Sequence, residues 1–218
     1  MMEAMIYVMR TGCPWRDLPS CFGPWESVYT RFRRWSQIGL WSTILDALAE
    51  RAKGKSRLID STHIKVHQDG ANPAGGQQNQ AIGRTKGGLN SKVTALVDGR
   101  GRVLQLGLSP GNAADLNAAK EIVFPAHVYI IADKGYDSDQ FKEQIRRKGS
   151  EPCIPSRRNR KHPAAYSKHR YATRHRIENF FQRVKRFRRI GTRYEKLDQT
   201  FLCMLTIAAV LDWLKYGF

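Results

Sequence analysis

The feature of this sequence that most limits its fold is a regular alternation of strand-like and helix-like segments beyond residue 57. The strand-like segments are short, apolar and rich in β-branched residues, whereas the segments between them have the apolar spacing of helices. The expected strands are RLIDSTHIKVH, KVTALVDGRGRVLQLGLS, which Asp98 and Gly99 fold into a hairpin, HVYIIADKGY and EPCIPS. This order predicts an α/β fold in which helices flank a mixed sheet.

Helices are expected at about 113–122, in DSDQFKEQIRRKG, at about 171–187 and in the C-terminal segment TFLCMLTIAAVLDWLK. The stretch QDGANPAGGQQNQAIGRTKGGLNS is expected to be a polar, glycine-rich loop. The longest apolar run, 201–211, has 11 residues and is too short to cross a bilayer. We therefore expect no membrane association.

Residues 1–54 have helical patterning that is interrupted by the turn-forming stretch TGCPWRDLPSCFGPW. We expect a small N-terminal helical region there, with the arginines of RFRRW as candidates for DNA contact, and a catalytic domain over 55–218. The first residues have the pattern of a helix interior, because no capping residue precedes the apolar positions. This pattern suggests that the chain begins late.

The charge of the chain indicates a polyanionic partner. Lys and Arg number 37 against 19 Asp and Glu, which leaves a net charge of +18. Between residues 151 and 196 there are 15 basic and 3 acidic residues, so +12 of this charge lies in one stretch. Such a concentration is typical of proteins that neutralise phosphates.

The four cysteines have neither zinc-site spacing nor disulfide density, so we expect reduced thiols in a cytosolic protein.

The helix expected at 171–187 has one polar face beside its apolar stripe. At about 100° per residue, Tyr171, Arg174, Glu178 and Lys185 fall on a single narrow face. Glu178 is a lone carboxylate within the most basic part of the chain. A simple ion pair with Arg174 along the helix is the alternative to a role in a site.

Two aspartates stand on expected buried strands. Asp60 follows Leu58 and Ile59, and Asp133 ends the apolar run VYIIAD. An uncompensated buried carboxylate is costly, so these acids are expected to have a partner. Together with Glu178 they offer hard oxygen ligands for Mg²⁺ or Mn²⁺, and two such ions promote in-line displacement at phosphorus. Turn or cap roles are the alternative, and these are expected for Asp98 in its hairpin and for Asp137 or Asp139 at a helix start.

Several separate motifs resemble one family. LIDSTHIKVH, GRTKGGLNSK, LSPGNAADLNAA and ADKGYDS are similar to motifs of insertion-sequence transposases of the "insertion sequence five" type. Tyr171, Arg174, Glu178 and Lys185 match the signature tyrosine, arginine, glutamate and lysine of that family, and TGCPWRDLP, FGPW and RFRRW resemble its N-terminal region. The resemblance covers nearly the whole chain and implies a ribonuclease H-like core with an Asp, Asp, Glu triad.

The resemblance also implies roles for these residues. Asp60, Asp133 and Glu178 are the expected catalytic residues and the ligands of two Mg²⁺ or Mn²⁺ ions. Arg174, Lys185 and Tyr171 are expected to hold transposon-end DNA. The enzyme would cleave the terminal inverted repeats and join them to target DNA, as a homodimer assembled on DNA at the bacterial nucleoid.

Three further readings stay open from the sequence alone. Asp115 rivals Asp133 as the second catalytic acid, although we expect it to cap or line a helix start near Asn112. A truncated, non-catalytic remnant that binds DNA and regulates a full-length transposase is the alternative function, and a non-mobile ribonuclease H-like nuclease is a third.

His63 and His67 are set aside as zinc ligands because they share a strand and lack the HExxH glutamate. The tryptophans at 15, 25, 35 and 41 favour core packing over stacking on bases.

Overall fold

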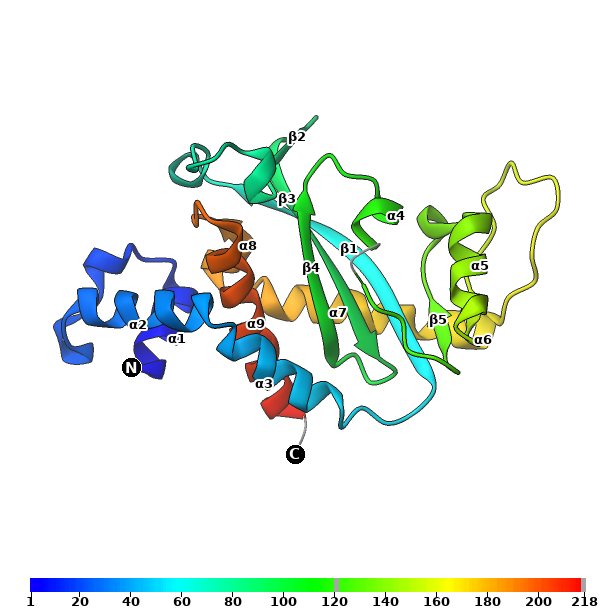
Figure 1. Ribbon diagram of the computed structural model, residues 1–218, viewed down its shortest axis with the longest axis horizontal. Helices are drawn as coiled ribbons and strands as arrows, with labels where there is room; N and C mark the ends of the chain where they lie inside the picture. Colours follow the sequence, from blue (N-terminus) through cyan, green and yellow to red (C-terminus); the bar gives the residue numbers. More distant parts are fainter. Residues whose placement is uncertain (120–121, 217–218) are drawn as a thin grey trace.

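A mixed sheet forms the centre of the computed structural model, which describes residues 1–119 and 122–216. Within these residues seven strands pair in the order β2 (Gly83–Thr85), β3 (Gly88–Asp98), β1 (Ser56–Val66), β5 (Tyr129–Ile131) and β6 (Glu151–Cys153), with β4 (Val103–Pro110) beside β3 and β7 (Thr192–Arg193) beside β1. β3 runs antiparallel to both of its long neighbours, β1 and β4, whereas β5 and β6 run parallel to β1 (Figure 1). This topology confirms the predicted ribonuclease H-like class, a mixed sheet flanked by helices.

The hairpin predicted at Asp98 and Gly99 joins β3 to β4. One carboxylate oxygen of Asp98 accepts the backbone N–H groups of Arg100 and Arg102, at 2.9 and 3.0 Å, and the other accepts the Arg102 guanidinium. The turn role expected for Asp98 is therefore confirmed, and the pair also neutralises a carboxylate that is fully buried.

A second hairpin was not predicted. Residues 83–90, which were expected to belong to a polar loop, form β2 and the start of β3, and Thr85 pairs with Gly88 across a tight turn. Polar contacts replace the apolar alternation that marks most strands, because the Asn90 amide donates to Thr85 Oγ1 at 2.6 Å and to the Gly88 carbonyl at 2.9 Å. Gly88 has a φ of 98°, a conformation that favours glycine.

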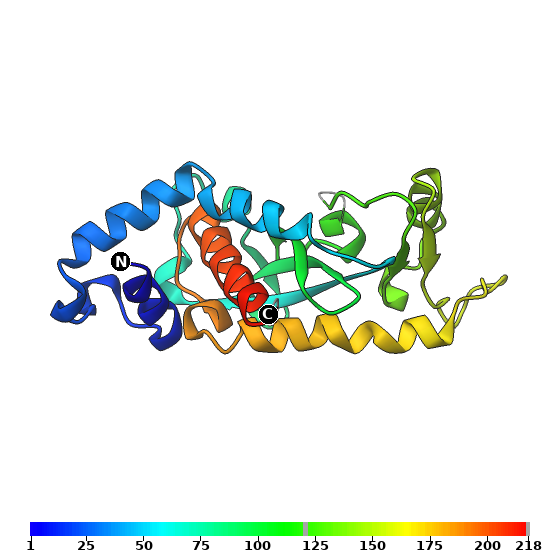
Figure 2. The same cartoon turned by 90° about the horizontal axis from the view of Figure 1, so that it is seen from below.

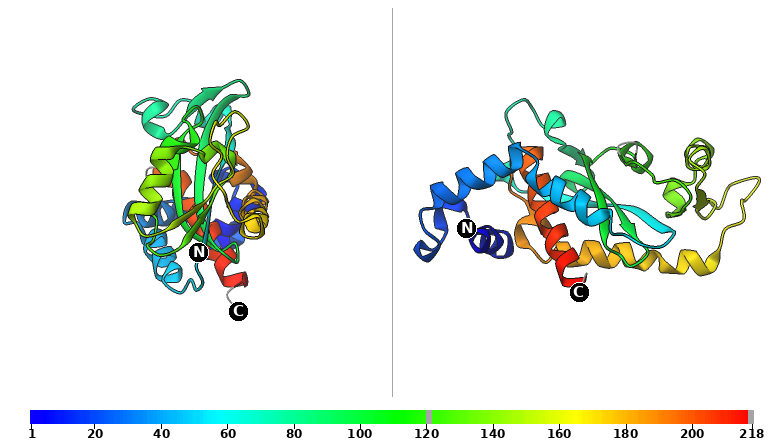
Figure 3. Two further views of the ribbon diagram at one scale, coloured as in Figure 1. Left: turned by 90° about the vertical axis from the view of Figure 1, so that its right-hand side faces the viewer. Right: turned by 60° about the horizontal axis from the view of Figure 1, so that its bottom comes forward.

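The helices cover both faces of the sheet and form two hydrophobic cores. On one face lie α3 (Leu40–Ala49), α7 (His175–Val184) and α9 (Asp198–Tyr216), and beyond them α1 (Met2–Thr11) packs against α8 (Arg188–Gly191) and α2 (Trp25–Gln37) packs against α9. On the other lie α4 (Asp115–Ala118) and α5 (Asp139–Arg147). Figure 3 shows the sheet between α5 and α7. A further short helix is α6 (Lys168–Tyr171).

The helix expected at 171–187 consists of α6, the 3₁₀ turn Ala172–Arg174 and α7, which together run as one rod along the sheet (Figure 2). The apolar stripe predicted for this helix has five side chains. Ile177, Phe180, Phe181 and Val184 are buried, whereas Phe187 is partly buried and directly precedes α8. The apolar C-terminal segment forms α9, with Phe201, Met204 and Ile207 fully buried. Among the described residues, no helix is both long and apolar enough to span a membrane.

The N-terminal helices share a core with the sheet. Val8 of α1, Phe32 of α2 and Leu45 of α3 are buried in the same cluster as Val103 of β4 and Phe201 of α9. The three arginines of RFRRW are exposed on α2, so their expected DNA contact stays a prediction, as does the boundary at residue 54.

The helix expected at 113–122 is much shorter than predicted. It is a single turn, α4, and positions 120 and 121 of the prediction lie outside the described residues. Below, α4 matters because it carries Asp115 to the edge of the candidate site.

Candidate active site

Strand register brings Asp60 and Asp133 to the same level on neighbouring strands of the sheet. In the parallel pair β1 and β5, Leu58 lies opposite Ile131, an offset of 73 residues, and Asp133 follows Asp60 by the same 73. Side chains two residues apart on a strand point to the same face. Leu58 and Ile131 belong to the core that packs against α7, so both aspartates start on the face that α7 covers.

Glu178 approaches this face from α7. The guanidinium of Arg174, one turn earlier in the same rod, donates to Asp60 Oδ2 at 3.1 Å and also forms an ion pair with Glu178. The ion pair between Arg174 and Glu178, which was the alternative to a role in a site, therefore exists. The same guanidinium also contacts Asp60 on β1. One cation links carboxylates that lie 118 residues apart, from position 60 to position 178.

The charge of the third carboxylate, Asp133, acts on Asp60. The pKa of Asp60 is raised from 3.8 to about 6, mainly by burial, with further contributions from the negative charges of Asp133 and Glu178. The Ser61 backbone N–H and the Arg174 guanidinium oppose this shift. The Asp60 side chain is 18% exposed and that of Glu178 44%, so the acids line a surface that solvent reaches. Like charges that repel in this way are a suitable setting for a bound cation.

The backbone after β5 fixes the Asp133 carboxylate. Its Oδ1 accepts the Gly135 N–H at 2.7 Å, which starts the 3₁₀ turn Lys134–Tyr136. A Cβ atom on Gly135 would lie 2.8 Å from that oxygen and 3.5 Å from Asp115 Oδ2, so a larger residue would displace the carboxylate. Glycine at this position is therefore required by the close approach.

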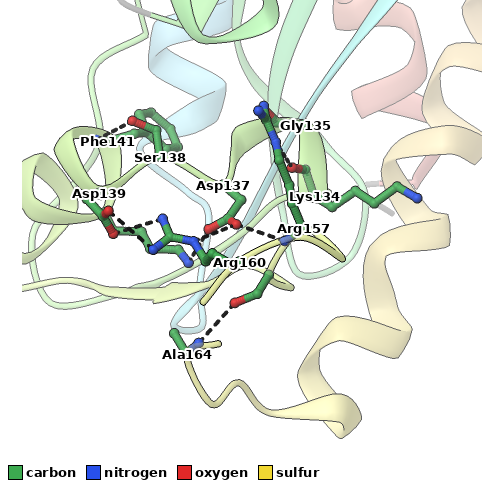
Figure 4. A network of polar contacts seen from close by, with 11 residues as sticks. Lys134, Gly135, Asp137, Ser138, Asp139, Phe141, Arg157, Arg160 and Ala164 are labelled. Atoms are coloured by element: carbon green, nitrogen blue, oxygen red, sulfur yellow. Dashed lines mark hydrogen bonds and ion pairs between the residues drawn. The ribbon is translucent and has the colours of Figure 1, made fainter. Parts of the chain in front are cut away.

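A buried ion-pair network holds the same turn against the basic connector 155–167 (Figure 4). Asp137 accepts from Lys142 at 2.6 Å, and its other oxygen accepts from the Arg157 N–H and the Arg160 guanidinium, both at 2.8 Å. Burial alone would raise the pKa of Asp137, but these three donors lower it to about 2. The Arg157 side chain reaches back to the Gly135 carbonyl at 2.9 Å, so the network supports the turn that holds Asp133.

Of the turn or cap role expected for Asp137 or Asp139 at a helix start, the cap part is wrong, although Asp139 is the first residue of α5. Ser138 caps α5 by accepting the Phe141 N–H, because its hydroxyl lies directly before the helix (Figure 4). Asp139 pairs instead with Arg160 at 2.8 Å and is 84% exposed. The sequence could not separate these roles, because Asp and Ser both serve as caps.

The two other residues of the predicted DNA-binding set lie along the same rod. Tyr171 is next to Arg174, with its ring centroid 6.0 Å from the guanidinium carbon, and burial raises its pKa. The Lys185 ammonium donates to Thr62 Oγ1 at 2.6 Å and to the His63 carbonyl at 3.1 Å, and burial lowers its pKa. Arg174 and Lys185 thus contact β1 at Asp60 and at Thr62, and Tyr171 lies beside Arg174.

Asp115 lies at the margin of the site, on the side of the sheet opposite α7. It begins α4, but its carboxylate makes no capping hydrogen bond and instead accepts from Lys92 at 2.7 Å. The buried Tyr136 hydroxyl, bonded to Ser61 at 2.9 Å, is surrounded by the charges of Asp115, Asp60 and Asp133. Burial and these charges hold its pKa well above the usual range.

Sequence reasoning missed Lys92, Ser61 and Tyr136. The available signal was Lys92 itself, since a charged residue within the otherwise apolar strand KVTALV needs a buried partner. The histidines set aside as ligands make local contacts: His63 pairs with the Gly111 carbonyl, and His67 stacks on Tyr194.

The residue types present fit a divalent cation. Asp60, Asp133 and Glu178 supply hard carboxylate oxygens, which Mg²⁺ and Mn²⁺ prefer, and their mutual repulsion is what such an ion relieves. As the side chains stand, however, no three acidic, histidine or cysteine residues in the described part of the chain are positioned to hold a metal ion. Arg174 takes the place of the cation between Asp60 and Glu178.

Comparisons with known proteins identify a family for this chain. The family profile described as "Transposase DDE domain" matches residues 52–213, and the profile described as "Putative transposase of IS4/5 family" matches residues 1–45. A putative transposase for the insertion sequence element IS6501 of Brucella ovis is 29% identical over 130 residues, which cover 58% of this chain and all of that protein. An uncharacterised protein of Sinorhizobium fredii, y4sN, is 36% identical over 70 residues, which cover 32% of this chain and 56% of that protein.

Among solved structures, the cryo-EM structure of a piggyBac transposase synaptic complex with hairpin DNA has a TM-score of 0.49 and 10% sequence identity. The match covers 81% of this chain and 50% of that chain, so this chain spans about half the length of that protein. The family profile that covers residues 52–213 includes all three candidate acids. The chain belongs to the insertion-sequence transposases with a DDE domain.

Proposed function

We propose that this transposase cleaves DNA at the ends of an insertion sequence and transfers the freed ends to target DNA. The observation that supports this most is the link that Arg174 makes between Asp60 on β1 and Glu178 on α7. Asp133, at the matching register position after β5, completes the set of acids. The proposed triad, Asp60, Asp133 and Glu178, is of the kind that the family resemblance implies for DNA cleavage.

Asp60, Asp133 and Glu178 would hold two Mg²⁺ or Mn²⁺ ions. When bound, these ions would supply Lewis-acid stabilisation of the attacking and leaving oxygens. The ammonium of Lys185 and the guanidinium of Arg174 would contact the phosphates of the bound strand, with Tyr171 beside Arg174. Arg174 would move from its ion pairs to a phosphate when the carboxylates receive their ions.

The chemistry is two successive displacements at phosphorus. In the first, the oxygen of a water molecule forms a bond to phosphorus, and the 3′ oxygen of the element leaves as a hydroxyl. In the second, the oxygen of that 3′-hydroxyl forms a bond to the phosphorus of a target phosphodiester and gives its proton to solvent. The bond from that phosphorus to the target's 3′ oxygen breaks, and this oxygen takes up a proton from solvent and leaves as a hydroxyl. The chain's part is to orient the strand in line and to stabilise the charge that develops on the oxygens.

The test is cleavage of a labelled duplex that carries the inverted repeats flanking the gene, with Mg²⁺ present. Asp60→Asn, Asp133→Asn and Glu178→Gln are each expected to lower the cleavage rate at least about a thousandfold while DNA binding remains. Asp139→Asn is the matched control, because it removes an exposed carboxylate near the site that serves only an ion pair.

Cleavage that persists in any of the three variants would exclude that acid from the set. Tight, salt-sensitive DNA binding without cleavage by the wild-type protein would instead support the non-catalytic remnant. Equal cutting of sequences unrelated to the repeats would support a general nuclease. Light scattering of the DNA complex tests the homodimer that the family resemblance implies, and action on chromosomal DNA would place the protein at the nucleoid.

A further inference from the structure

A cavity of about 900 Å³ lies between the N-terminal region and the segments on either side of β7. The N-terminal helices α1 and α2 lie at the end of the molecule opposite to α5 (Figure 1). We call the cavity the Trp15 groove and define it by six of its lining residues: Trp15, Trp25, Tyr29, Arg16, Arg189 and Tyr194. Lys196 and Asp69 stand at its margin. Nothing in the proposed cleavage reaction uses this groove.

The aromatic side chains of the groove form a connected set. The Trp15 and Tyr29 ring centroids are 5.3 Å apart, and those of Trp25 and Tyr29 are 6.5 Å apart. Tyr194 faces them from the other side, held by stacking on His67 at 4.5 Å. Trp15, Trp25, Tyr29 and Tyr194 are all half-buried, so part of each ring stays accessible to a ligand.

Arg189 is built into the floor of this set. It is only 7% exposed, and its Nε and Nη1 atoms donate to Glu195 at 2.8 Å and to the Cys13 carbonyl at 2.7 Å. Its guanidinium carbon lies 5.3 Å from the Tyr194 ring and 6.0 Å from that of Trp15. Nη2 donates no hydrogen bond to the described residues. A fixed, buried guanidinium with a spare donor is suited to a phosphate oxygen.

The charge around the groove favours an anion. Arg16 and Lys196 are exposed basic residues at its rim, and Asp69 is the one acid among the lining residues in the described chain. Aromatic faces combined with arginine and lysine are the chemistry that binds unpaired nucleotides, because every base has a face that stacks and every linkage carries a charge.

The groove is also placed on the path from the candidate acids. β1 runs from Asp60 to Val66, and the pairing of Val66 with Arg193 brings Tyr194 next to His67. His67 is seven residues beyond Asp60, a span of roughly 23 Å at about 3.3 Å per residue. Lys185 contacts Thr62 between these two points. A DNA strand held at the acids would meet Lys185 before it reaches the groove.

We infer that the Trp15 groove binds an unpaired nucleotide of DNA, with the base against the rings of Trp25 and Tyr194 and the phosphate at Arg189. The inference rests on DNA as the partner of the proposed function but does not depend on cleavage. Trp15 also packs on the buried Phe32, at 5.1 Å, and Arg189 is tied to Glu195. Trp25 and Tyr194 are therefore the side chains to change.

The test is fluorescence anisotropy of a labelled 15-nucleotide single strand of thymidine and of a blunt 20-base-pair duplex, both in EDTA so that no cleavage occurs. Trp25→Leu and Tyr194→Leu are each expected to raise the Kd for the single strand about tenfold. Neither is expected to change the Kd for the blunt duplex. Trp35→Leu is the matched control, because Trp35 lies on the same helix, pairs with Trp41 and does not line the groove.

Unchanged single-strand affinity in both variants would overturn the inference, and so would an equal loss for the blunt duplex. A thermal unfolding curve like that of the wild type shows that a variant is folded. If Trp25→Leu does not fold, Tyr194→Leu still tests the groove. If the ends are cleaved normally while both variants bind like the wild type, the groove fails alone. If single-strand binding depends on Trp25 and no cleavage occurs with Mg²⁺, the proposed function fails alone.

Discussion

Arg174 Nη1 donates to Asp60 Oδ2 over 3.1 Å, and this contact joins residues that are 114 positions apart in the chain. The same guanidinium also pairs with Glu178, so the strand carboxylate and the helix carboxylate share one counter-ion. The arrangement explains how two acids that repel each other are held together at the surface of a folded protein. It also predicts how the stability of the protein depends on pH.

The Asp60 carboxyl is expected to reduce stability as the pH rises. Its pKa is about 6 in the folded protein and 3.8 without the fold, so the folded state holds its proton longer than the unfolded state. The free energy of unfolding should therefore fall between about pH 4 and pH 6, by up to roughly 3 kcal/mol. Urea unfolding without divalent ions, compared between the wild type and Asp60→Asn, isolates this contribution.

From about pH 4 to pH 6, the free energy of unfolding of Asp60→Asn should therefore rise relative to that of the wild type. Comparison of differences is needed because Asn also weakens the contact with Arg174. A difference that stays constant from pH 4 to pH 7 would contradict the raised pKa.

The Asp137 network should give the opposite pH dependence. The pKa of Asp137 is lowered to about 2, so its contribution is complete above the unfolded value of 3.8 and is lost as the pH falls towards 2. Asp137→Asn is expected to lower the free energy of unfolding by roughly 2 kcal/mol at pH 7. The gap between variant and wild type should close between pH 4 and pH 2, as followed by circular dichroism. A gap that persists at pH 2 would show that charge is not its cause, and Asp139→Asn serves as the exposed control.

Much of the fold follows from the sequence, and so does the identity of the residues on each face. β1 and β5 are apolar runs that end or continue in an aspartate, and α7 has a clear apolar stripe, so both were predicted. The hairpin of β2 was not, because Asn90 and Thr85 stabilise it through side-chain hydrogen bonds rather than through an apolar pattern.

Pairing between distant residues was also beyond the sequence. The helical spacing of Arg174 and Glu178 predicts their ion pair, but nothing in the spacing shows that Asp60 shares it. Lys92 and Asp115 are 23 residues apart and meet only because α4 packs against β3 in the folded protein. Such contacts depend on tertiary packing, which a local pattern does not record.

Lys185 should contribute to DNA binding through charge. Its ammonium is held at β1 by Thr62 and His63, close to the candidate acids, so Lys185→Met removes a cation while keeping an apolar stem. We expect weaker binding of all duplex sequences and a decrease of about one in the slope of log Kobs against log salt concentration. Titrations at several salt concentrations measure this slope, and a slope equal to that of the wild type would exclude a phosphate contact.

Asp115 should support the site without being one of its catalytic acids. Its carboxylate is held by Lys92 on the sheet face away from α7, near the turn of Gly135. Asp115→Asn is therefore expected to lower the cleavage rate about tenfold through a shift of that turn, against a loss of about a thousandfold in Asp133→Asn. Single-turnover cleavage rates distinguish the two. Equal losses would make Asp115 a candidate for the second catalytic acid.

The central claim, that Asp60, Asp133 and Glu178 hold divalent ions, is tested most directly by exchanging ligand and metal together. A thiolate is a poor ligand for Mg²⁺ and a better one for softer ions such as Mn²⁺. Each of Asp60→Cys, Asp133→Cys and Glu178→Cys should lose cleavage in Mg²⁺ and recover at least about tenfold in Mn²⁺, relative to the wild type, whereas Asp115→Cys should show no such dependence on the metal. Loss of cleavage that is equal in both metals for all three variants would contradict the claim.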